Sequence, residues 1–120
     1  MNRGTVVLVV EDMEEARELA RTVLARSGFL VLTAPDAEAA LRVMRIVIID
    51  VLFTDIVLPG GMNGYQLARL AHSINPLIKV ICTTGFQWAL ETSWDVCRVM
   101  LSKPYLPEQL IAEVERAVAL

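Results

Sequence analysis

The chain has 120 residues, of which 55% are hydrophobic and 21% are charged, and its formal net charge is −3. This length and apolar content predict one domain, over residues 1–120, with a single well-covered core. The acidic balance and the lack of a Lys/Arg cluster argue against direct binding to nucleic acid or to an anionic membrane. No apolar run reaches the ~18 residues of a membrane span and no signal segment is recognisable, so we expect a cytoplasmic protein.

The first third of the chain changes from strand-like to helical periodicity and back. Residues 5–10 are apolar and largely β-branched without alternation, which is typical of a parallel strand covered on both faces. A helix is expected from Glu14 to Ser27, with Gly28 as its cap and the pairs Glu14/Arg17 and Glu18/Arg21 on its exposed side. Its inward positions are Ala16, Leu19, Ala20, Val23 and Leu24.

A second strand is expected over residues 29–34, followed by a second helix with Asp36 as N-cap. Its inward positions are Ala37, Ala40, Leu41 and Met44. The end of this helix is open, because residues 46–49 are all apolar and fit helix, loop or early strand equally well. A third strand then ends at Asp55, where the apolar run gives way to a turn rich in proline and glycine.

The second half of the chain continues the same alternation. Asn63 or Gly64 opens a third helix, which ends at Asn75-Pro76, with a buried stripe expected at Leu67, Leu70, Ala71 and Ile74. Strands are expected over residues 78–83 and 99–101, with a short helix from Gly85 to about Asp95 between them. The last helix begins near Pro107, with inward positions Leu110, Ile111, Val114, Ala117 and Val118. Five strands alternating with five helices predict a doubly wound parallel sheet with helices on both faces.

The two cysteines, Cys82 and Cys97, follow neither a metal-ligand spacing nor the pattern of a disulfide framework. The simplest interpretation is a pair of reduced thiols in buried strands. Reduced thiols are also the usual state in a cytosolic protein.

Polar residues stand at the carboxyl ends of four of these strands. Glu11 and Asp12 follow the first, Asp55 ends the third, and Thr84 and Lys103 follow the fourth and fifth. Parallel strands bring their carboxyl ends to one edge of a sheet, which is where open α/β sheets bind ligands. Three converging carboxylates repel one another unless a cation joins them, and hard oxygen ligands suit Mg²⁺. A hydroxyl and an ammonium at the same point would complement an anion such as a phosphoryl group on Asp55.

Each of these residues also has an ordinary structural interpretation. Asp55 could cap the turn that follows it, and Glu11-Asp12 could be a helix-start pair that interacts with the macrodipole. Thr84 could be a turn hydroxyl and Lys103 a solvated charge. Together, at one sheet edge, they favour a functional site over these separate explanations.

Several of these segments together resemble the bacterial response-regulator receiver domain. They are Glu11-Asp12, Asp55 with the turn from Pro59 to Gly64, Thr84-Gly85 and Lys103-Pro104-Tyr105. Each motif is weak alone, but their order and spacing are specific, and the match spans essentially the whole chain. The resemblance implies a flavodoxin-like sheet of strand order 2-1-3-4-5. It also implies that a histidine kinase or a histidine phosphotransfer protein transfers a phosphoryl group to Asp55.

The resemblance assigns a role to each site residue. Asp12 and Asp55 would ligate Mg²⁺ directly and Glu11 through water, and the Val57 backbone carbonyl would complete the protein ligands. Thr84 would bond a phosphoryl oxygen and Lys103 would pair with the free or phosphorylated carboxylate. The protein would then be a signalling switch that catalyses only its own phosphorylation and dephosphorylation, with an unknown downstream protein partner and the option of forming a homodimer.

The chain departs from the family pattern in ways that keep other functions open. In receivers an aromatic residue commonly stands three positions before the lysine, where this chain has Met100. The segment 87–98 is compressed as well. A degenerate receiver that acts only as a binding or dimerisation module is therefore the alternative function. A phosphatase of the haloacid-dehalogenase type is disfavoured, because it needs a second Asp where this chain has Val57.

Overall fold

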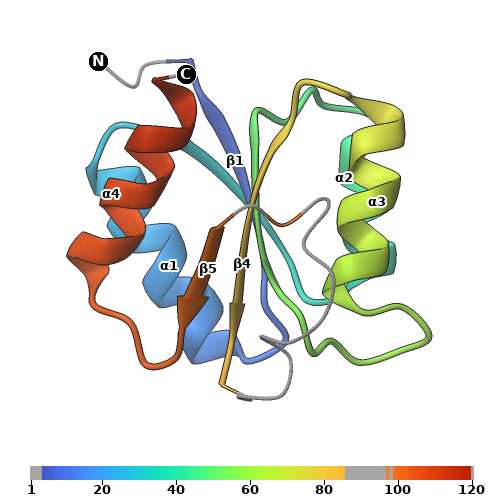
Figure 1. Cartoon of the computed structure of the whole chain (residues 1–120), viewed down its shortest axis with the longest axis horizontal. Helices are drawn as coiled ribbons and strands as arrows, with labels where there is room; N and C mark the ends of the chain where they lie inside the picture. Colours follow the sequence, from blue (N-terminus) through green and yellow to red (C-terminus); the bar gives the residue numbers. More distant parts are fainter. Residues whose placement is uncertain (1–3, 86–96, 98, 120) are drawn as a thin grey trace.

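A five-stranded parallel sheet forms the centre of the molecule. The computed structural model describes residues 4–85, 97 and 99–119. The strands are β1 (Val6–Val10), β2 (Leu30–Ala34), β3 (Val51–Asp55), β4 (Lys79–Thr84) and β5 (Val99–Ser102), in the order β2-β1-β3-β4-β5. The described helices are α1 (Glu14–Arg26), α2 (Ala37–Met44), α3 (Gly64–Ile74) and α4 (Pro107–Val118). Helices α1 and α4 cover one face of the sheet, and α2 and α3 cover the other (Figure 1).

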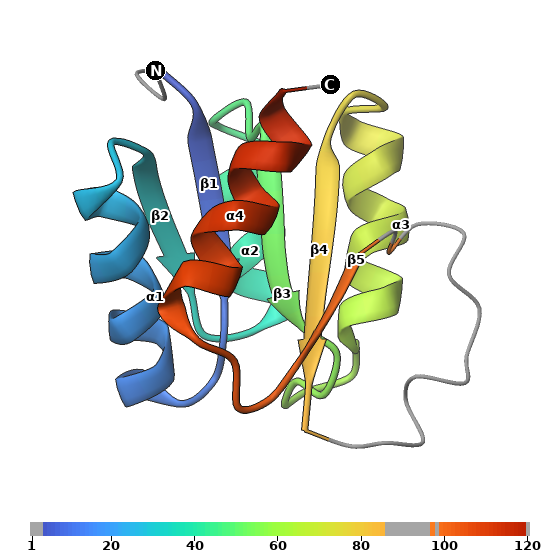
Figure 2. The same ribbon diagram turned by 60° about the vertical axis from the view of Figure 1, so that its left-hand side comes forward.

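This architecture confirms the predicted doubly wound sheet and its strand order. Strand pairing is parallel throughout, and β3 lies between β1 and β4, so its carboxyl end is central (Figure 2). The helix expected from Gly85 to about Asp95 falls almost entirely outside the described residues. Within the part of the chain that is described, no helix is both long and apolar enough to cross a bilayer.

The core consists of two layers, one on each face of the sheet. In β1, Val7 and Val9 pack with α1 and α4, whereas Leu8 and Val10 pack with α2 and α3. The strand is apolar without alternation because both of its faces are buried. The same rule applies to β3, so a polar side chain at its end meets solvent only at the edge of the sheet.

The helix boundaries agree with the sequence signals. The Asp36 side chain accepts a hydrogen bond from the Ala39 backbone N–H at 2.8 Å, which confirms it as the N-cap of α2. Helix α1 ends at Arg26 with Ser27 as C-cap, so the expected cap Gly28 stands one residue further along, where its φ is 96°. The expected ion pairs form at 4.0 Å for Glu14–Arg17 and 2.9 Å for Glu18–Arg21.

Some positions expected in the buried stripes are wrong. Leu19 is 55% exposed, and Leu70 and Ile74 are exposed as well. In α3 the expected positions Leu67 and Ala71 are buried, and Ala68 joins them on the buried face. The buried face of α3 is therefore narrower than the spacing of its large apolar residues indicated.

The apolar segment after α2 is a connection and not a helix or strand. Helix α2 ends at Met44 and β3 begins at Val51. Ile46 and Ile48 are 83% and 78% exposed, whereas Ile49 is buried. Val47, Ile48 and Ile49 line one side of an apolar groove of about 190 Å³ whose other side is the end of α3.

The expectation of two reduced thiols is wrong. Cys82 and Cys97 form a disulfide bond, with their Cα atoms 5.9 Å apart. Only Cys82 lies in a strand, because Cys97 precedes β5 by two residues. Spacing alone could not reveal the pair, since the bond depends on the fold bringing the approach to β5 against the middle of β4.

Candidate functional site

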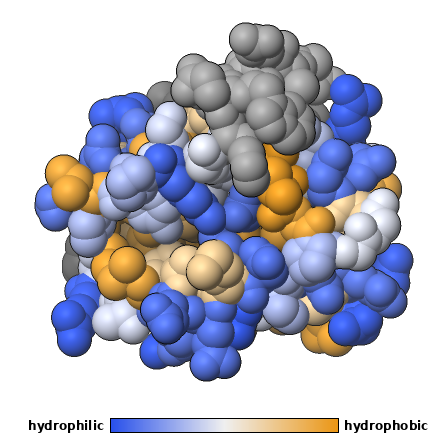
Figure 3. Space-filling view, turned by 90° about the horizontal axis from the view of Figure 1, so that it is seen from below, coloured by the Kyte–Doolittle hydropathy of each residue, from blue (hydrophilic) through white to orange (hydrophobic). Residues whose placement is uncertain are grey.

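The carboxyl edge of the sheet gathers the polar residues that the sequence singled out. Glu11 and Asp12 follow β1, Asp55 ends β3, Thr84 ends β4, and Lys103 follows β5. Figure 3 views the molecule from this edge, where hydrophilic residues cover most of the visible surface and apolar patches lie among them. The predicted convergence of these chain segments is therefore observed.

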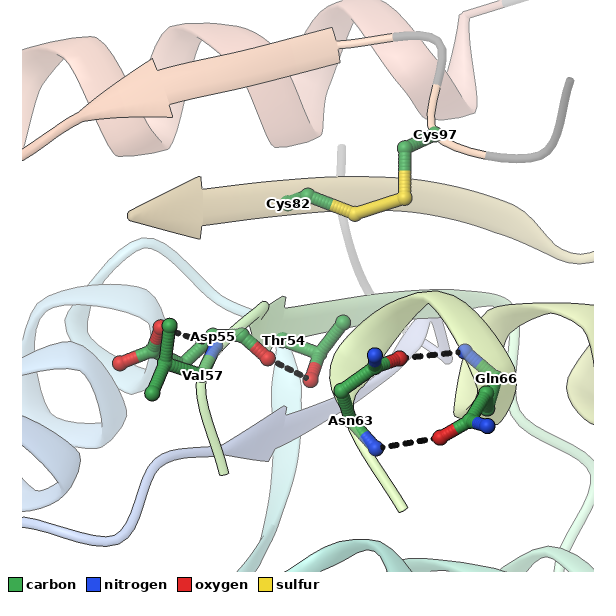
Figure 4. The surroundings of a disulfide bond; sticks show 7 residues. All are labelled: Thr54, Asp55, Val57, Asn63, Gln66, Cys82 and Cys97. Atoms are coloured by element: carbon green, nitrogen blue, oxygen red, sulfur yellow. Dashed lines mark hydrogen bonds between the residues drawn. A yellow bond between two sulfur atoms is a disulfide. The ribbon is translucent and has the colours of Figure 1, made fainter. Parts of the chain in front are cut away.

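Asp55 is held by its neighbours on both carboxylate oxygens. Its Oδ1 accepts a hydrogen bond from the Val57 backbone N–H at 3.1 Å (Figure 4). Its Oδ2 accepts one from Lys103 Nζ at 2.7 Å. The residue is buried, which fits a carboxylate whose charge is balanced by a nearby cation and not by bulk water. Its position is fixed by these two hydrogen bonds.

Lys103 joins two of the carboxylates. Its Nζ lies 2.7 Å from Asp55 Oδ2 and 2.8 Å from Glu11 Oε2, and its side chain is 26% exposed. The backbone fixes this reach, because the Lys103 N–H donates to the Thr84 carbonyl at 2.9 Å and so extends the β4–β5 pairing by one residue. The pairing with Asp55 was expected, whereas the pairing with Glu11 was not.

The three carboxylates form a compact cluster. Glu11, Asp12 and Asp55 each place an oxygen within 4.8 Å of the others. Glu11 and Asp55 are buried, whereas Asp12 is exposed at the outer side. Arg17 braces the loop by donating to the Glu11 carbonyl at 3.0 Å, so its guanidinium contacts the backbone of the cluster. Carboxylate oxygens in this number are a donor set that a hard divalent cation fits.

The electrostatics follow from burial and from these pairs. Burial raises the pKa of Glu11, and the charge of Asp55 adds to that effect, although the hydrogen bond from Lys103 acts against it. Burial acts to lower the pKa of Lys103, but its hydrogen bonds to Asp55 and Glu11 outweigh it and raise that pKa. Two acids around one ammonium leave negative charge at the site, which is the condition for attracting a cation.

The turn after Asp55 returns the chain closely over the acceptor. Asn63 caps α3 by accepting from the Gln66 N–H at 2.9 Å, and the Gln66 side chain accepts from the Asn63 N–H at 2.9 Å (Figure 4). The Gly64 N–H donates to the Ile56 carbonyl at 2.8 Å. A Cβ on Gly64 would collide with the Asp55 carbonyl oxygen and lie 2.8 Å from the Ile56 Cα. Gly64 is therefore a packing requirement of the site.

The remaining predicted residues lie at the same edge. Thr84 is buried at the end of β4, and its neighbour Thr83 donates its hydroxyl to the Leu101 carbonyl at 2.7 Å. Thr83 is thus already engaged between β4 and β5. Val57 is 41% exposed, and its backbone N–H already donates a hydrogen bond to Asp55.

Sequence reasoning missed three contributors to the site. The Arg17 guanidinium carried no signal, because the residue appeared only as half of a helical ion pair. The Glu11–Lys103 contact joins residues 92 positions apart and depends on the sheet order. The close approach of Gly64 had a weak signal, since this glycine ends the run from Pro59 to Gly64.

These observations define a doubly wound, flavodoxin-like α/β domain with an acidic cluster and a lysine at the carboxyl edge of its sheet. A family model described as the response regulator receiver domain matches residues 7–115. The chain belongs to the response regulator receiver domain family.

Individual relatives agree with this placement. The chain is 33% identical over 113 residues to the response regulator receiver protein CpdR of Brucella abortus, covering 92% of this chain and 93% of that protein. It is 31% identical over 109 residues to the sensor histidine kinase RcsC of Salmonella typhimurium, covering 86% of this chain but 11% of the kinase. A crystal structure of a response regulator receiver domain protein from Clostridium thermocellum superposes with a TM-score of 0.83 at 25% identity, covering 96% of this chain and 94% of that one.

Proposed function

We propose that this receiver domain is a phosphoryl-accepting switch whose acceptor is Asp55. The observation that carries the proposal is the arrangement around this carboxylate, which lies buried beside two further acids and is hydrogen-bonded to Lys103 at 2.7 Å. A carboxylate fixed in this way is oriented for attack without being freely solvated. The family membership supports the same role.

The donor would be a phosphohistidine of a histidine kinase or of a histidine phosphotransfer protein. An oxygen of Asp55 attacks phosphorus, the P–O bond forms, and the P–N bond to the histidine breaks. The leaving imidazole takes the electron pair of that bond and binds a proton. Each phosphoryl group is transferred once to the protein itself, so the domain is a stoichiometric acceptor and not an enzyme acting on a separate product.

Each residue at the carboxyl edge of the sheet would have a separate role in phosphorylation. Glu11, Asp12 and Asp55, with the Val57 backbone carbonyl, would hold Mg²⁺, which supplies neutralisation of the charge on the phosphoryl oxygens. Lys103 would pair with the acceptor before and after transfer, and Thr84 would bond a phosphoryl oxygen. Asp12 is the exposed member of the cluster, so it would bind a cation that arrives from solvent. A cytoplasmic location and an unidentified downstream protein partner belong to the same proposal.

Phosphorylation by a small donor tests the proposal. The protein is incubated with acetyl phosphate, with Mg²⁺ or with EDTA, and its intact mass is measured. We expect one phosphoryl addition with Mg²⁺, none in Asp55→Asn, and normal addition in Asp50→Asn. Asp50 is a matched control, because it immediately precedes β3 and bonds the Val6 N–H at the opposite edge of the sheet. Equal labelling of the two variants would reject the acceptor assignment, and absent labelling of wild type would favour a degenerate binding module.

A further inference from the structure

The disulfide between Cys82 and Cys97 plays no part in the site just described. Cys82 lies in β4, two residues before Thr84, and Cys97 lies two residues before β5. Figure 4 shows the bond reaching from the middle of β4 to the chain that leads into β5. Both side chains are fully buried in the core layer beneath α2 and α3. The bond therefore lies in the interior of the fold.

The position of the bond matters because of what it encloses. The two cysteines are separated by 15 positions, and Thr84 lies inside the covalent ring that they close. Cys82 pairs in register with Met100 of β5. Lys103 is attached to the same ring by its backbone hydrogen bond to the Thr84 carbonyl. The bond thus restrains the β4–β5 pair that carries both residues proposed to respond to the phosphoryl group.

The chemical setting makes two states of this pair accessible. Two cysteines with Cα atoms 5.9 Å apart are close enough to bond when an oxidant is present, and a dithiol can reverse the bond by exchange. We propose that Cys82 and Cys97 form a reversible redox-modification site, oxidised by a small-molecule disulfide such as oxidised glutathione and reduced by a dithiol. The redox chemistry of the two cysteines is independent of the proposed function. Only the effect of the bond on signalling rests on the proposed function.

The exchange balances through two displacements. One cysteine thiolate attacks the glutathione disulfide, which forms a mixed disulfide and releases one glutathione thiolate. The second cysteine thiolate then attacks the protein sulfur of that mixed disulfide, and the second glutathione leaves. Two electrons pass from the protein to glutathione, and the two thiol protons end on the released glutathione or in water. Cys97 is outside the strand ladder, so it is the side that has to move away from β4 for exchange to begin.

The signalling consequence follows from which strands carry which groups. Asp55 ends β3, and Glu11 and Asp12 follow β1, so the bond does not touch the acceptor or the acidic cluster. Phosphorylation should therefore proceed in both redox states. The change that it produces in β4 and β5 should be smaller in the oxidised protein, because the bond ties Cys82, two residues before Thr84, to Cys97 at the approach to β5.

Equilibration in glutathione buffers tests the redox site. The whole protein is held at a series of reduced-to-oxidised glutathione ratios, quenched in acid, unfolded, alkylated and weighed. We expect a transition from two alkylated thiols to none, and Cys97→Ser should never form the internal bond, so its one remaining thiol is found either alkylated or carrying glutathione. A pair that stays reduced at every ratio, or stays oxidised in excess dithiothreitol, would overturn the proposal.

Thermal unfolding of wild type tests the restraint. The oxidised form should unfold at a Tm higher than that of the reduced form by roughly 10 °C, from the size of the closed loop. Equal Tm values would contradict the restraint.

A second experiment tests the effect of the bond on signalling. It compares oxidised and reduced wild type after addition of acetyl phosphate and Mg²⁺. The phosphate-induced change in the backbone NMR shifts of β4 and β5 should be about half as large in the oxidised protein as in the reduced protein, or smaller. Equal changes in the two forms would overturn the proposed effect of the bond on signalling. Asp55→Asn should keep the same glutathione titration while losing the phosphate-dependent shifts. Failure of the redox site therefore shows in the titration, and failure of the proposed acceptor shows in the shifts of reduced wild type.

Discussion

Replacing Gly64 by alanine should disturb the acceptor through its backbone. The added Cβ would collide with the Asp55 carbonyl oxygen, lie 2.8 Å from the Ile56 Cα and lie 3.0 Å from the Asp55 carbonyl carbon. All three neighbours are backbone atoms, so no flexible side chain can move aside. The same Asp55 carbonyl accepts the Thr54 hydroxyl at 2.8 Å, which fixes it further.

Two opposing effects determine how much Gly64→Ala changes the free energy of unfolding. Overpacking of this kind costs about 1–3 kcal/mol, and replacing a helical glycine by alanine recovers at most ~1 kcal/mol. We therefore expect Gly64→Ala to lower the free energy of unfolding by about 1–2 kcal/mol, which is a fall in Tm of roughly 4–10 °C. Because the shift is transmitted to Asp55, the rate of acetyl phosphate labelling should fall about tenfold.

Gly61→Ala is the matched control for this variant. Gly61 lies in the same turn, its Cβ would meet no atom within 4 Å, and its φ is not positive. This change should be neutral or stabilise by at most ~1 kcal/mol, through the unfolded chain. Urea unfolding and the labelling rate of both variants are the assay. Equal stability and equal labelling of Gly64→Ala and Gly61→Ala would refute the packing argument.

Three further predictions concern signalling, pH and lifetime. Thr84→Ala and Lys103→Ala should still be labelled by acetyl phosphate but should show weaker phosphate-induced NMR shifts, and full-size shifts in both would contradict this division of roles. The pKa of Lys103 is raised in the folded protein, so the charged lysine contributes its full stabilisation below the ordinary value of 10.5. That stabilisation is lost as pH rises through the higher pKa of the folded state. In urea unfolding, the stability advantage of wild type over Lys103→Gln should therefore shrink above pH 10.5. Val57 and Phe86 stand two residues beyond Asp55 and Thr84 in the sequence, where a side chain could hold the water that hydrolyses the aspartyl phosphate. Neither side chain can hydrogen-bond a water, so the double variant Val57→Asn/Phe86→Glu should lose its phosphoryl group faster at saturating Mg²⁺; unchanged or slower decay argues against that cause. Phe86 lies outside the described residues, and its role rests on the sequence alone.

The sheet and most of the site were predictable because strand signals act locally. Apolar runs such as residues 51–55 identify buried parallel strands, and parallel strands necessarily bring their ends to one edge. Asp55, Glu11 and Lys103 could therefore be placed together before any contact was known. The cap Asp36 was equally readable, because it satisfies a backbone group within a few residues, whereas the start of α3 was left between Asn63, which is its N-cap, and Gly64.

Other features depend on the packed fold and had no local signal. The disulfide required the approach to β5 to lie against Cys82, which sequence spacing cannot show. Leu19 sits at an inward helical spacing, yet it is 55% exposed, so periodicity placed it wrongly. The exposed Ile46 and Ile48 fitted several structures, since their burial depends on where α2 stops. The contact between Lys103 and Glu11 depends on the strand order, which places the ends of β5 and β1 on either side of β3 and β4 at the same edge of the sheet.

The central claim is that Asp55 carries the phosphoryl group, and chemical mapping of the labelled residue tests it most directly. After acetyl phosphate and Mg²⁺, sodium borohydride reduces an aspartyl phosphate to homoserine, which peptide mass spectrometry can locate. We predict homoserine at position 55 in wild type and at no position in the EDTA sample. Homoserine at position 12, reduction at Glu11, or phosphate retained on a hydroxyl such as Thr84 would contradict the account.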